Sequence, residues 1–300
     1  MKILFYPREK CKYAMTIITD DENVAEIFKK RYFCREISPG SFALARTSEE
    51  FERLFVKIQK EIPKKTSVFC YNSNEKKAFF IESEGKTVHS VDFSLPQELF
   101  PIQVLENLLY ITLIPEDSVL ALHGAAIAKN GKAYLLLAST TCGKSTLTAF
   151  LWKKAGYEYI TDDEIFISRE DKCVLPVRKN LSLRQGGFDF LNIEFEIEHQ
   201  VFDGKAHTHL IVPQEELKFP KYEIEKIVFL AGYGSNEPYF VKMQPREAFS
   251  KLLKGQLSGE NSVGNVAEKY KILTELAQKS YEMRYSDLWT AEKYLGHLPQ

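Results

Sequence analysis

The feature that most constrains this chain is the stretch of residues 138–146, which reads Ala-Ser-Thr-Thr-Cys-Gly-Lys-Ser-Thr. An apolar run at residues 133–137 precedes it, and a helix-like segment at residues 147–152 follows it. A strand, a tight turn and a helix that starts with Gly-Lys-Ser form a phosphate-binding P-loop, because the turn gathers backbone N–H groups and the helix start adds positive charge. The predicted phosphate-binding residues are Ser139, Thr140, Thr141, Cys142, Gly143, Lys144, Ser145 and Thr146.

Two side chains of this stretch have specific expected roles. Lys144 would reach the terminal phosphates of a nucleotide, and the hydroxyl of Ser145 would complete the coordination shell of Mg²⁺. The first position departs from the G-x-x-x-x-G-K-[ST] pattern, because Ala138 stands where glycine is usual. Alanine fits there if its backbone stays extended. The alternative is a Ser/Thr-rich turn between a strand and a helix that binds nothing.

Composition and charge limit the classes of function. The chain has 300 residues, 44% hydrophobic and 27% charged, with a net charge of −1. It can therefore bury a core in one large or two smaller domains, and its charge does not support nucleic-acid binding. No apolar run approaches the roughly 20 residues of a membrane span, and the start is unlike a signal peptide. Five widely spaced cysteines without a C-x-x-C pair favour free thiols, so we expect a cytoplasmic protein without membrane partners.

The pattern of apolar residues divides the chain into two domains. Residues 1–95 resemble a small α/β accessory or recognition domain, and residues 96–300 form the domain that carries the P-loop. In the first domain we expect strands at residues 2–6, 14–18, 67–71, 77–81 and 87–89, a helix at 22–30, and a second helix with Ser48 as N-cap that stops before Pro63.

The second domain has its own expected elements. An apolar helix is predicted at residues 104–113, and Asn130-Gly131 predicts a hairpin turn before the P-loop strand. Further elements are predicted as strands at residues 165–167, 173–175, 224–230 and 281–285, a helix with Pro245 at its first position, and a helix at residues 265–279. His207-Thr208-His209 would place two imidazoles on one face of a strand, either as a metal pair or in a surface or substrate loop.

Two adjacent acids follow the P-loop helix by one strand. In a P-loop phosphotransferase, one carboxylate can orient Mg²⁺ and another can accept the proton of an attacking hydroxyl, and Asp162 and Asp163 are the candidates. Neighbouring residues on a strand point to opposite faces, so both face the phosphates only if the backbone turns there. The alternative is a solvated Asp-Asp turn or a helix cap.

Three ordered motifs together resemble a known family. His123-Gly124-Ala125, then Gly143-Lys144-Ser145-Thr146, then residues 155–163 are similar to the C-terminal catalytic domain of HPr kinase/phosphorylase. The similarity is greater still to the divergent HPr-kinase-like proteins of peptide-modification gene clusters, which include kinases of lasso-peptide precursors. It covers about residues 118–290, and it implies an α/β P-loop kinase domain of the HPr kinase / PEP carboxykinase type.

The resemblance also implies roles for single residues. Asp162 and Asp163 match the paired acids of the family, one of which is its general base, and His123 matches a site histidine. A later family segment, Glu-x-Arg-Gly, has its nearest match at residues 182–185, where Arg184 is retained but Ser182 replaces the glutamate that helps to bind metal. The metal ligands would then be Ser145 and Asp163, and we expect kinase activity without the reverse phosphorylase reaction.

These observations lead to two expectations of different classes. The first is a Mg²⁺-dependent kinase that uses ATP or another nucleotide to phosphorylate a serine hydroxyl of a peptide or protein, with Lys144 and Arg184 assisting catalysis. The second is a P-loop nucleotide-binding regulator or partner protein without transfer activity, which Ala138 and the missing glutamate would favour. The motifs carry no information on the oligomeric state.

Overall fold

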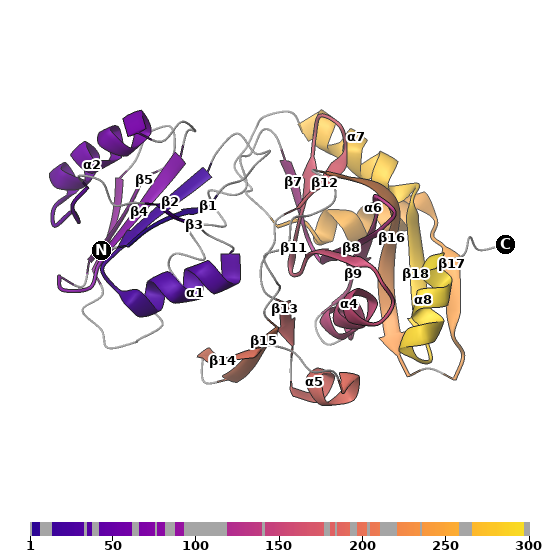
Figure 1. Cartoon of the computed structure of the whole chain (residues 1–300). Coiled ribbons are helices and arrows are strands. Elements are labelled where there is room, and N and C mark those ends of the chain that lie inside the picture. Colours follow the sequence, from indigo (N-terminus) through magenta and orange to yellow (C-terminus); the bar gives the residue numbers. More distant parts are fainter. Residues whose placement is uncertain are drawn as a thin grey trace. The chain divides into compact units, whose positions relative to one another are not determined.

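The structure, a computed structural model, is mixed α/β, as the sequence predicts. It describes residues 2–6, 14–32, 35–37, 42–61, 66–75, 77–81, 88–92, 119–139, 142–176, 181–183, 185–192, 197–202, 205–210, 221–234, 236–257 and 266–296. The chain divides into two compact units, residues 1–115 and 116–300 (Figure 1). The predicted boundary near residue 95 and the predicted helix at 104–113 lie outside the described residues and stay predictions.

The first unit contains a six-stranded sheet in the order β3-β1-β2-β4-β5-β6. Its strands are β1 (Lys2–Tyr6), β2 (Ala14–Thr19), β3 (Arg35–Ile37), β4 (Thr66–Asn72), β5 (Lys77–Ile81) and β6 (Val88–Asp92). The pair β2–β4 is parallel, and the other pairs are antiparallel. The strands predicted for this unit are therefore confirmed.

Helices α1 (Glu22–Tyr32) and α2 (Ser48–Glu61) cover opposite faces of this sheet (Figure 1). Ile18 belongs to the core under α2, where the rings of Phe51 and Phe79 stack with centroids 5.5 Å apart. Side chains alternate along a strand, so the buried Ile17 faces the α1 side. Strand β2 is thus buried on both faces, and its two threonines, Thr16 and Thr19, are buried with the apolar residues.

The predicted N-cap of α2 is wrong by one residue. The hydroxyl of Thr47, not Ser48, accepts a hydrogen bond from the backbone N–H of Glu50 at 3.2 Å, and the Thr47 carbonyl accepts one from Phe51. The Glu50 carboxylate also accepts the backbone N–H of Arg46 at 2.8 Å. A capping glutamate stands three residues after Thr47, whereas Phe51 stands three residues after Ser48, so only Thr47 has the acidic partner.

The second unit contains a nine-stranded sheet whose main path is β10-β8-β9-β16-β12-β11-β7, with β18 beside β16 and β17 beside β18. Its strands are β7 (Val119–His123), β8 (Ala125–Lys129), β9 (Lys132–Leu137), β10 (Glu158–Thr161), β11 (Glu164–Ser168), β12 (Cys173–Leu175), β16 (Tyr222–Tyr233), β17 (Tyr239–Lys242) and β18 (Ser280–Tyr285). The long central strand β16 runs parallel to both β9 and β18. The predicted turn joins β8 to β9, with positive φ angles of 53° at Asn130 and 76° at Gly131.

Helices cover both faces of this second sheet. Helices α6 (Pro245–Lys254) and α7 (Val266–Ala277) close one core, which contains Leu135, Leu137 and Phe229. Helices α4 (Lys144–Lys153) and α8 (Leu288–Gly296) lie together, and the rings of Phe150 and Trp289 meet edge-on at 4.9 Å. Helix α6 has proline in its first turn, as predicted.

Several elements were not predicted. Helix α8 follows the expected closing strand, and its start is fixed by the Asp287 carboxylate, which accepts the backbone N–H of Thr290 at 2.9 Å. A three-stranded sheet, β13-β15-β14, and a short helix α5 also belong to this unit. Their bounds are β13 (Leu181–Leu183), α5 (Gln185–Leu191), β14 (Ile197–Phe202) and β15 (Lys205–Leu210). Strand β15 does contain His207-Thr208-His209, as predicted, and a metal role for the pair stays a prediction.

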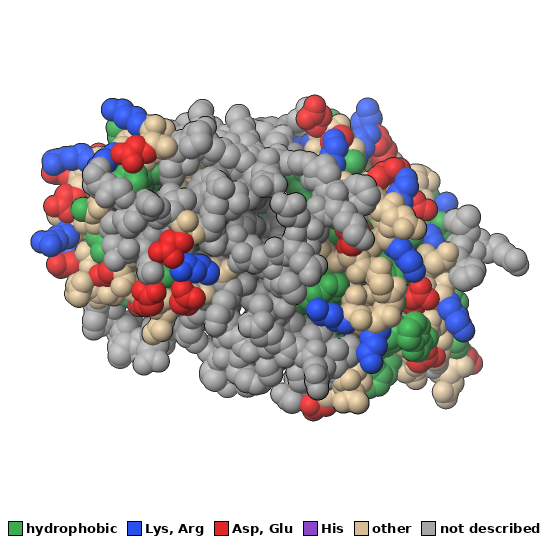
Figure 2. Space-filling view, viewed as in Figure 1, with side chains coloured by type: hydrophobic (Ala, Val, Ile, Leu, Met, Phe, Trp, Pro, Cys, Tyr) green, Lys and Arg blue, Asp and Glu red, His purple; other side chains and the backbone are tan. Residues whose placement is uncertain are grey.

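The described surface mixes charges of both signs. On the face in Figure 2, blue and red side chains are interspersed over both units, and the described side chains form no continuous positive patch there. This distribution agrees with the net charge of −1. Within the described part of the chain, no helix is both long and apolar enough to span a bilayer.

Replacing the N-cap of α2 tests the corrected helix start. Thr47→Ala should lower the free energy of unfolding of the first unit by about 1 kcal/mol, because the N–H of Glu50 loses its acceptor. Ser48→Ala, one residue along, should change it by less than about 0.5 kcal/mol. Urea unfolding of both variants measures the difference, and a larger loss for Ser48→Ala would restore the original prediction.

Candidate functional site

The elements on either side of the loop between β9 and α4 are a strand and a helix, as the sequence predicts. Strand β9 ends at Leu137 and helix α4 begins at Lys144, with Gly143 between them at φ 81° and ψ 12°. Glycine reaches this left-handed conformation without strain. A Cβ atom on Gly143 would also lie only 3.0 Å from the hydroxyl of Tyr285, so a larger residue would have to push that side chain aside. Burial raises the pKa of Tyr285, which keeps that hydroxyl protonated.

The alanine at the first position of the loop causes no strain. The described non-glycine residues with positive φ are Asn130, Asp163, Lys172 and Asn192, so Ala138 has the negative φ that any residue adopts. Next to it, the hydroxyl of Ser139 lies 3.1 Å from the thiol of Cys142, which closes the loop. The predicted phosphate ligands Thr140 and Thr141 lie outside the described residues.

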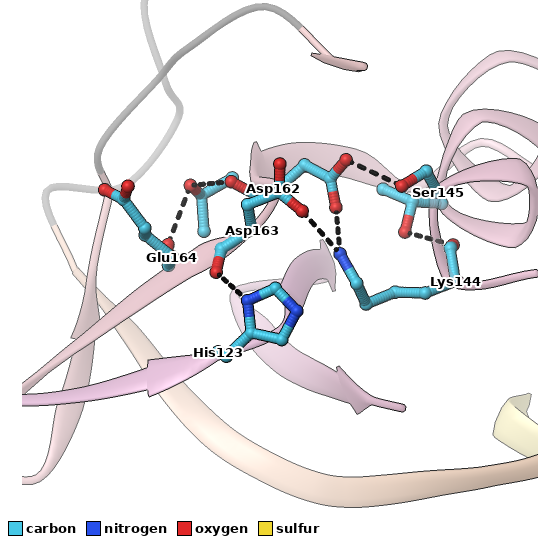
Figure 3. Close-up of polar contacts among 8 residues, drawn as sticks. His123, Lys144, Ser145, Asp162, Asp163 and Glu164 are labelled. Atoms are coloured by element: carbon cyan, nitrogen blue, oxygen red, sulfur yellow. Dashed lines mark hydrogen bonds and ion pairs between the residues drawn. The ribbon is translucent and has the colours of Figure 1, made fainter. Parts of the chain in front are cut away.

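The two acids occupy a turn in the backbone and not the body of a strand. Strand β10 ends just before Asp162 and β11 begins just after Asp163, whose φ is 65°. The left-handed residue turns the chain, so both carboxylates point to Lys144 in spite of their adjacency (Figure 3). Lys144 Nζ donates to Oδ1 of Asp162 at 2.6 Å and to Oδ1 of Asp163 at 3.1 Å.

The three charged side chains differ in burial. The side chains of Lys144 and Asp162 are 10% and 1% exposed, whereas that of Asp163 is 44% exposed. The hydroxyl of Ser145 donates to the second oxygen of Asp162 at 2.9 Å, so both oxygens of this carboxylate accept hydrogen bonds within the protein. Burial lowers the pKa of Lys144, but the carboxylates of Asp162 and Asp163 raise it by more, and the net shift is upward. Lys144 is therefore a fixed cation at physiological pH.

A bend in a pair of strands brings the acids to this position. Strand β8 pairs with β10, and β7 pairs with β11. The segment β7–β8 and the segment β10–β11 therefore form one antiparallel ribbon, which bends between β7 and β8 and, opposite, between β10 and β11. At the bend, the Asp163 carbonyl accepts the backbone N–H of Gly124 at 3.2 Å. A Cβ atom on Gly124 would lie 2.8 Å from the Leu136 carbonyl oxygen and 2.8 Å from Ile165 Cδ1. Glycine is thus needed where the bend packs on the end of β9.

His123 supports the acid pair through the backbone. Its Nδ1 lies 3.0 Å from the carbonyl oxygen of Asp163 (Figure 3), and because a carbonyl only accepts, Nδ1 carries the proton. The backbone N–H of His123 donates to the carbonyl of Gly255 at 2.8 Å. His123 therefore holds the turn at Asp163 through the backbone carbonyl of that residue.

The structure describes only some of the remaining predicted site residues. Arg184 lies outside the described residues, while Ser182 lies on β13 opposite His209. Thr146, in the first turn of α4, lies 2.5 Å from the position of a Cβ atom on Gly187, so α5 packs directly against the helix start. The sequence analysis missed this contact and that of Tyr285 because both come from segments distant along the chain.

The oxygen atoms at the helix start suit a hard divalent cation. Within the described residues, no cluster of three or more His, Cys, Asp or Glu side chains could hold a metal. The hydroxyl of Ser145 and the carboxylates of Asp162 and Asp163 are oxygen donors of the kind Mg²⁺ prefers, and Mg²⁺ bound with phosphates takes only one or two protein ligands.

Comparisons with protein-family models and with curated proteins gave no match to this chain. The family resemblance therefore stays a prediction, and the function has to be argued from the geometry of the site.

Adding one methyl group at the bend tests the packing there. Gly124→Ala should lower the free energy of unfolding of the second unit by about 1–3 kcal/mol, because the new atom meets a backbone oxygen that cannot move aside easily. Gly186→Ala is the matched control, since a Cβ atom there meets nothing within 4 Å. Calorimetry should show a lower Tm only for Gly124→Ala, and equal Tm values would contradict this account of the bend.

Neutralising each acid separately tests their unequal burial. Asp162→Asn should lower the free energy of unfolding by about 3–5 kcal/mol, because buried Lys144 loses its closest counter-charge. Asp163→Asn should change it by less than about 1 kcal/mol, because this carboxylate is exposed and asparagine tolerates a positive φ. Thermal unfolding of the two variants gives the comparison, and the reverse order would refute it.

Proposed function

We propose that the second unit is a Mg²⁺-dependent kinase that transfers a phosphoryl group from ATP, or another nucleotide, to a serine hydroxyl of a peptide or protein. The observation that carries this proposal is the cluster at the start of α4, where Lys144 meets a buried carboxylate and an exposed one. Phosphoryl transfer requires a cation to hold the phosphates and a base for the attacking hydroxyl, and this cluster offers both.

The helix start supplies the groups that would hold the phosphates. The first N–H groups of a helix have no partner within it, so those of Ser145 and Thr146 can donate to phosphate oxygens, aided by the helix dipole. The ammonium of Lys144 has three donors, and the two contacts to Asp162 and Asp163 leave the third for a phosphate oxygen. The carboxylates orient this lysine without removing its charge.

The difference in burial assigns separate roles to the two acids. Asp163 is 44% exposed, so a substrate hydroxyl can reach it. As the hydroxyl oxygen bonds to the γ-phosphorus, the bond to the leaving nucleoside diphosphate breaks and Asp163 takes the proton. Asp162 is buried and bonded to Lys144 and Ser145, which suits an orienting role.

The contacts favour a revised pair of metal ligands. The sequence led to Ser145 and Asp163 as the ligands of Mg²⁺, yet the Ser145 hydroxyl bonds to Asp162. We therefore propose Ser145 and Asp162 as the groups beside the ion. Mg²⁺, when bound with the nucleotide, would neutralise charge on the phosphates.

Two further parts of the proposal rest on other grounds. His123 is a positioning residue, since it holds the carbonyl of Asp163 and so fixes the direction of the proposed base. The serine acceptor and the absence of a reverse reaction rest on the family resemblance and on Ser182 in place of the family's glutamate.

Mass spectrometry of serine-containing peptides after incubation with ATP and Mg²⁺ tests the function. The wild-type protein should add one phosphate, and EDTA should abolish the gain. Asp163→Asn should lower the transfer rate by roughly 10²- to 10⁴-fold, because the hydroxyl loses its base. Asp171→Asn is the matched control. Asp171 lies in the turn after β11, where its carboxylate pairs with Lys221, and its substitution should leave the transfer rate unchanged.

The outcomes separate the two functional classes. Transfer that falls in Asp163→Asn and in Lys144→Met but not in the control supports the kinase. The other outcome is that the wild-type protein binds nucleotide, Lys144→Met does not, and no serine peptide is phosphorylated. That outcome would favour the nucleotide-binding regulator.

A further inference from the structure

Two large aromatic side chains remain exposed near the β9–α4 loop. Phe190 on α5 is 52% exposed and Tyr233 at the end of β16 is 48% exposed. Their rings meet edge-on with centroids 5.5 Å apart, and the Tyr233 ring lies 5.5 Å from that of buried Tyr285. The exposed pair is therefore anchored to the core through Tyr285.

The sheet places these rings beside the candidate phosphate site. The last residue of β9, Leu137, is in register with Phe229, and β16 continues for four more residues to Tyr233. At about 3.3 Å per residue, this extension carries the strand roughly 13 Å past the point where the loop begins. Tyr233 is in register with Tyr285, whose hydroxyl lies 3.0 Å from the Cβ position of Gly143 in the loop.

Helix α5 brings the second ring to the same place. Gly187 packs against the hydroxyl of Thr146 in the first turn of α4, and Phe190 follows three residues later on the same short helix. Both rings thus come from elements that contact the loop or the helix start. In the sheet order, β16 is the neighbour of β9 on one side and β8, followed by β10, on the other. Tyr233 is the last residue of β16, whereas the acid pair directly follows β10.

We propose that Phe190 and Tyr233 form the platform on which the purine base of the phosphoryl donor stacks. This inference rests on the proposed function and adds the subsite that distinguishes a nucleotide from a bare polyphosphate. A base is flat, with an apolar face that stacks on aromatic rings, and such stacking does not depend on hydrogen-bond partners. The acceptor would then approach from the side of Asp163, so that base and acceptor do not compete for one surface.

Titration calorimetry of the full chain with two ligands, Mg²⁺–ATP and Mg²⁺–tripolyphosphate, tests the platform. Phe190→Ala and Tyr233→Ala should each weaken ATP binding about tenfold, while tripolyphosphate affinity stays within twofold of wild type. Tyr233→Phe keeps the ring and should bind ATP like wild type. Tyr270→Ala is the matched control, because Tyr270 is 44% exposed on α7 and packs with Phe249.

Each outcome of these measurements supports or overturns a specific part of the proposal. Equal ATP affinities in wild type, Phe190→Ala and Tyr233→Ala would overturn the platform, even if transfer activity is present. A raised KM for the serine peptide with unchanged ATP affinity would overturn it as well and assign the rings to the acceptor. Wild-type protein that binds neither ligand would refute the proposed function and the platform with it, whereas binding of tripolyphosphate as tightly as ATP would refute the platform alone.

Discussion

The ion pair between Lys144 and Asp162 is the interaction on which the site depends. Both side chains are almost fully buried, and a buried charge without its partner costs several kcal/mol. The start of α4 and the turn between β10 and β11 therefore have to stay together in the folded chain. The hydroxyl of Ser145 accompanies the lysine, because it bonds to the same carboxylate. Asp163 then stays beside the pair with a carboxylate that solvent can reach.

The bent ribbon explains how a sheet can hold this cluster rigidly. Gly124 lets the bend pack against the end of β9, and the Gly124 N–H and the His123 ring both bond to the carbonyl of Asp163. Strands β7, β9 and β10 thus end close together, and the loop before α4 begins at the same place. Because a helix start and a two-residue turn between paired strands carry these groups, their geometry depends on the packing of the core and not on a free loop.

Much of the fold could be predicted because its signals are local. The turn at Asn130-Gly131, the strand, loop and helix around Gly143, and the helix that begins at Pro245 all depend on residues within a few positions. The predicted N-cap of α2 was wrong because Ser48 and Thr47 are both good caps by residue type. Only Thr47 has a glutamate, Glu50, three residues later. Helix α8, helix α5 and strands β13 and β14 were missed, since short elements are stabilised mainly by contacts with distant segments.

Local sequence determined that a glycine, a lysine and a hydroxyl stand at the start of a helix, and that two acids follow one strand later. It left open whether both acids could face the lysine, because adjacent residues on a strand point apart. Long-range contacts resolved that question: Asp163 is left-handed, and Gly124 and His123, about 40 residues earlier, hold its carbonyl. The same kind of contact made one acid buried and the other exposed. Burial depends on which segments pack together, and a pattern of neighbouring residues does not contain that information.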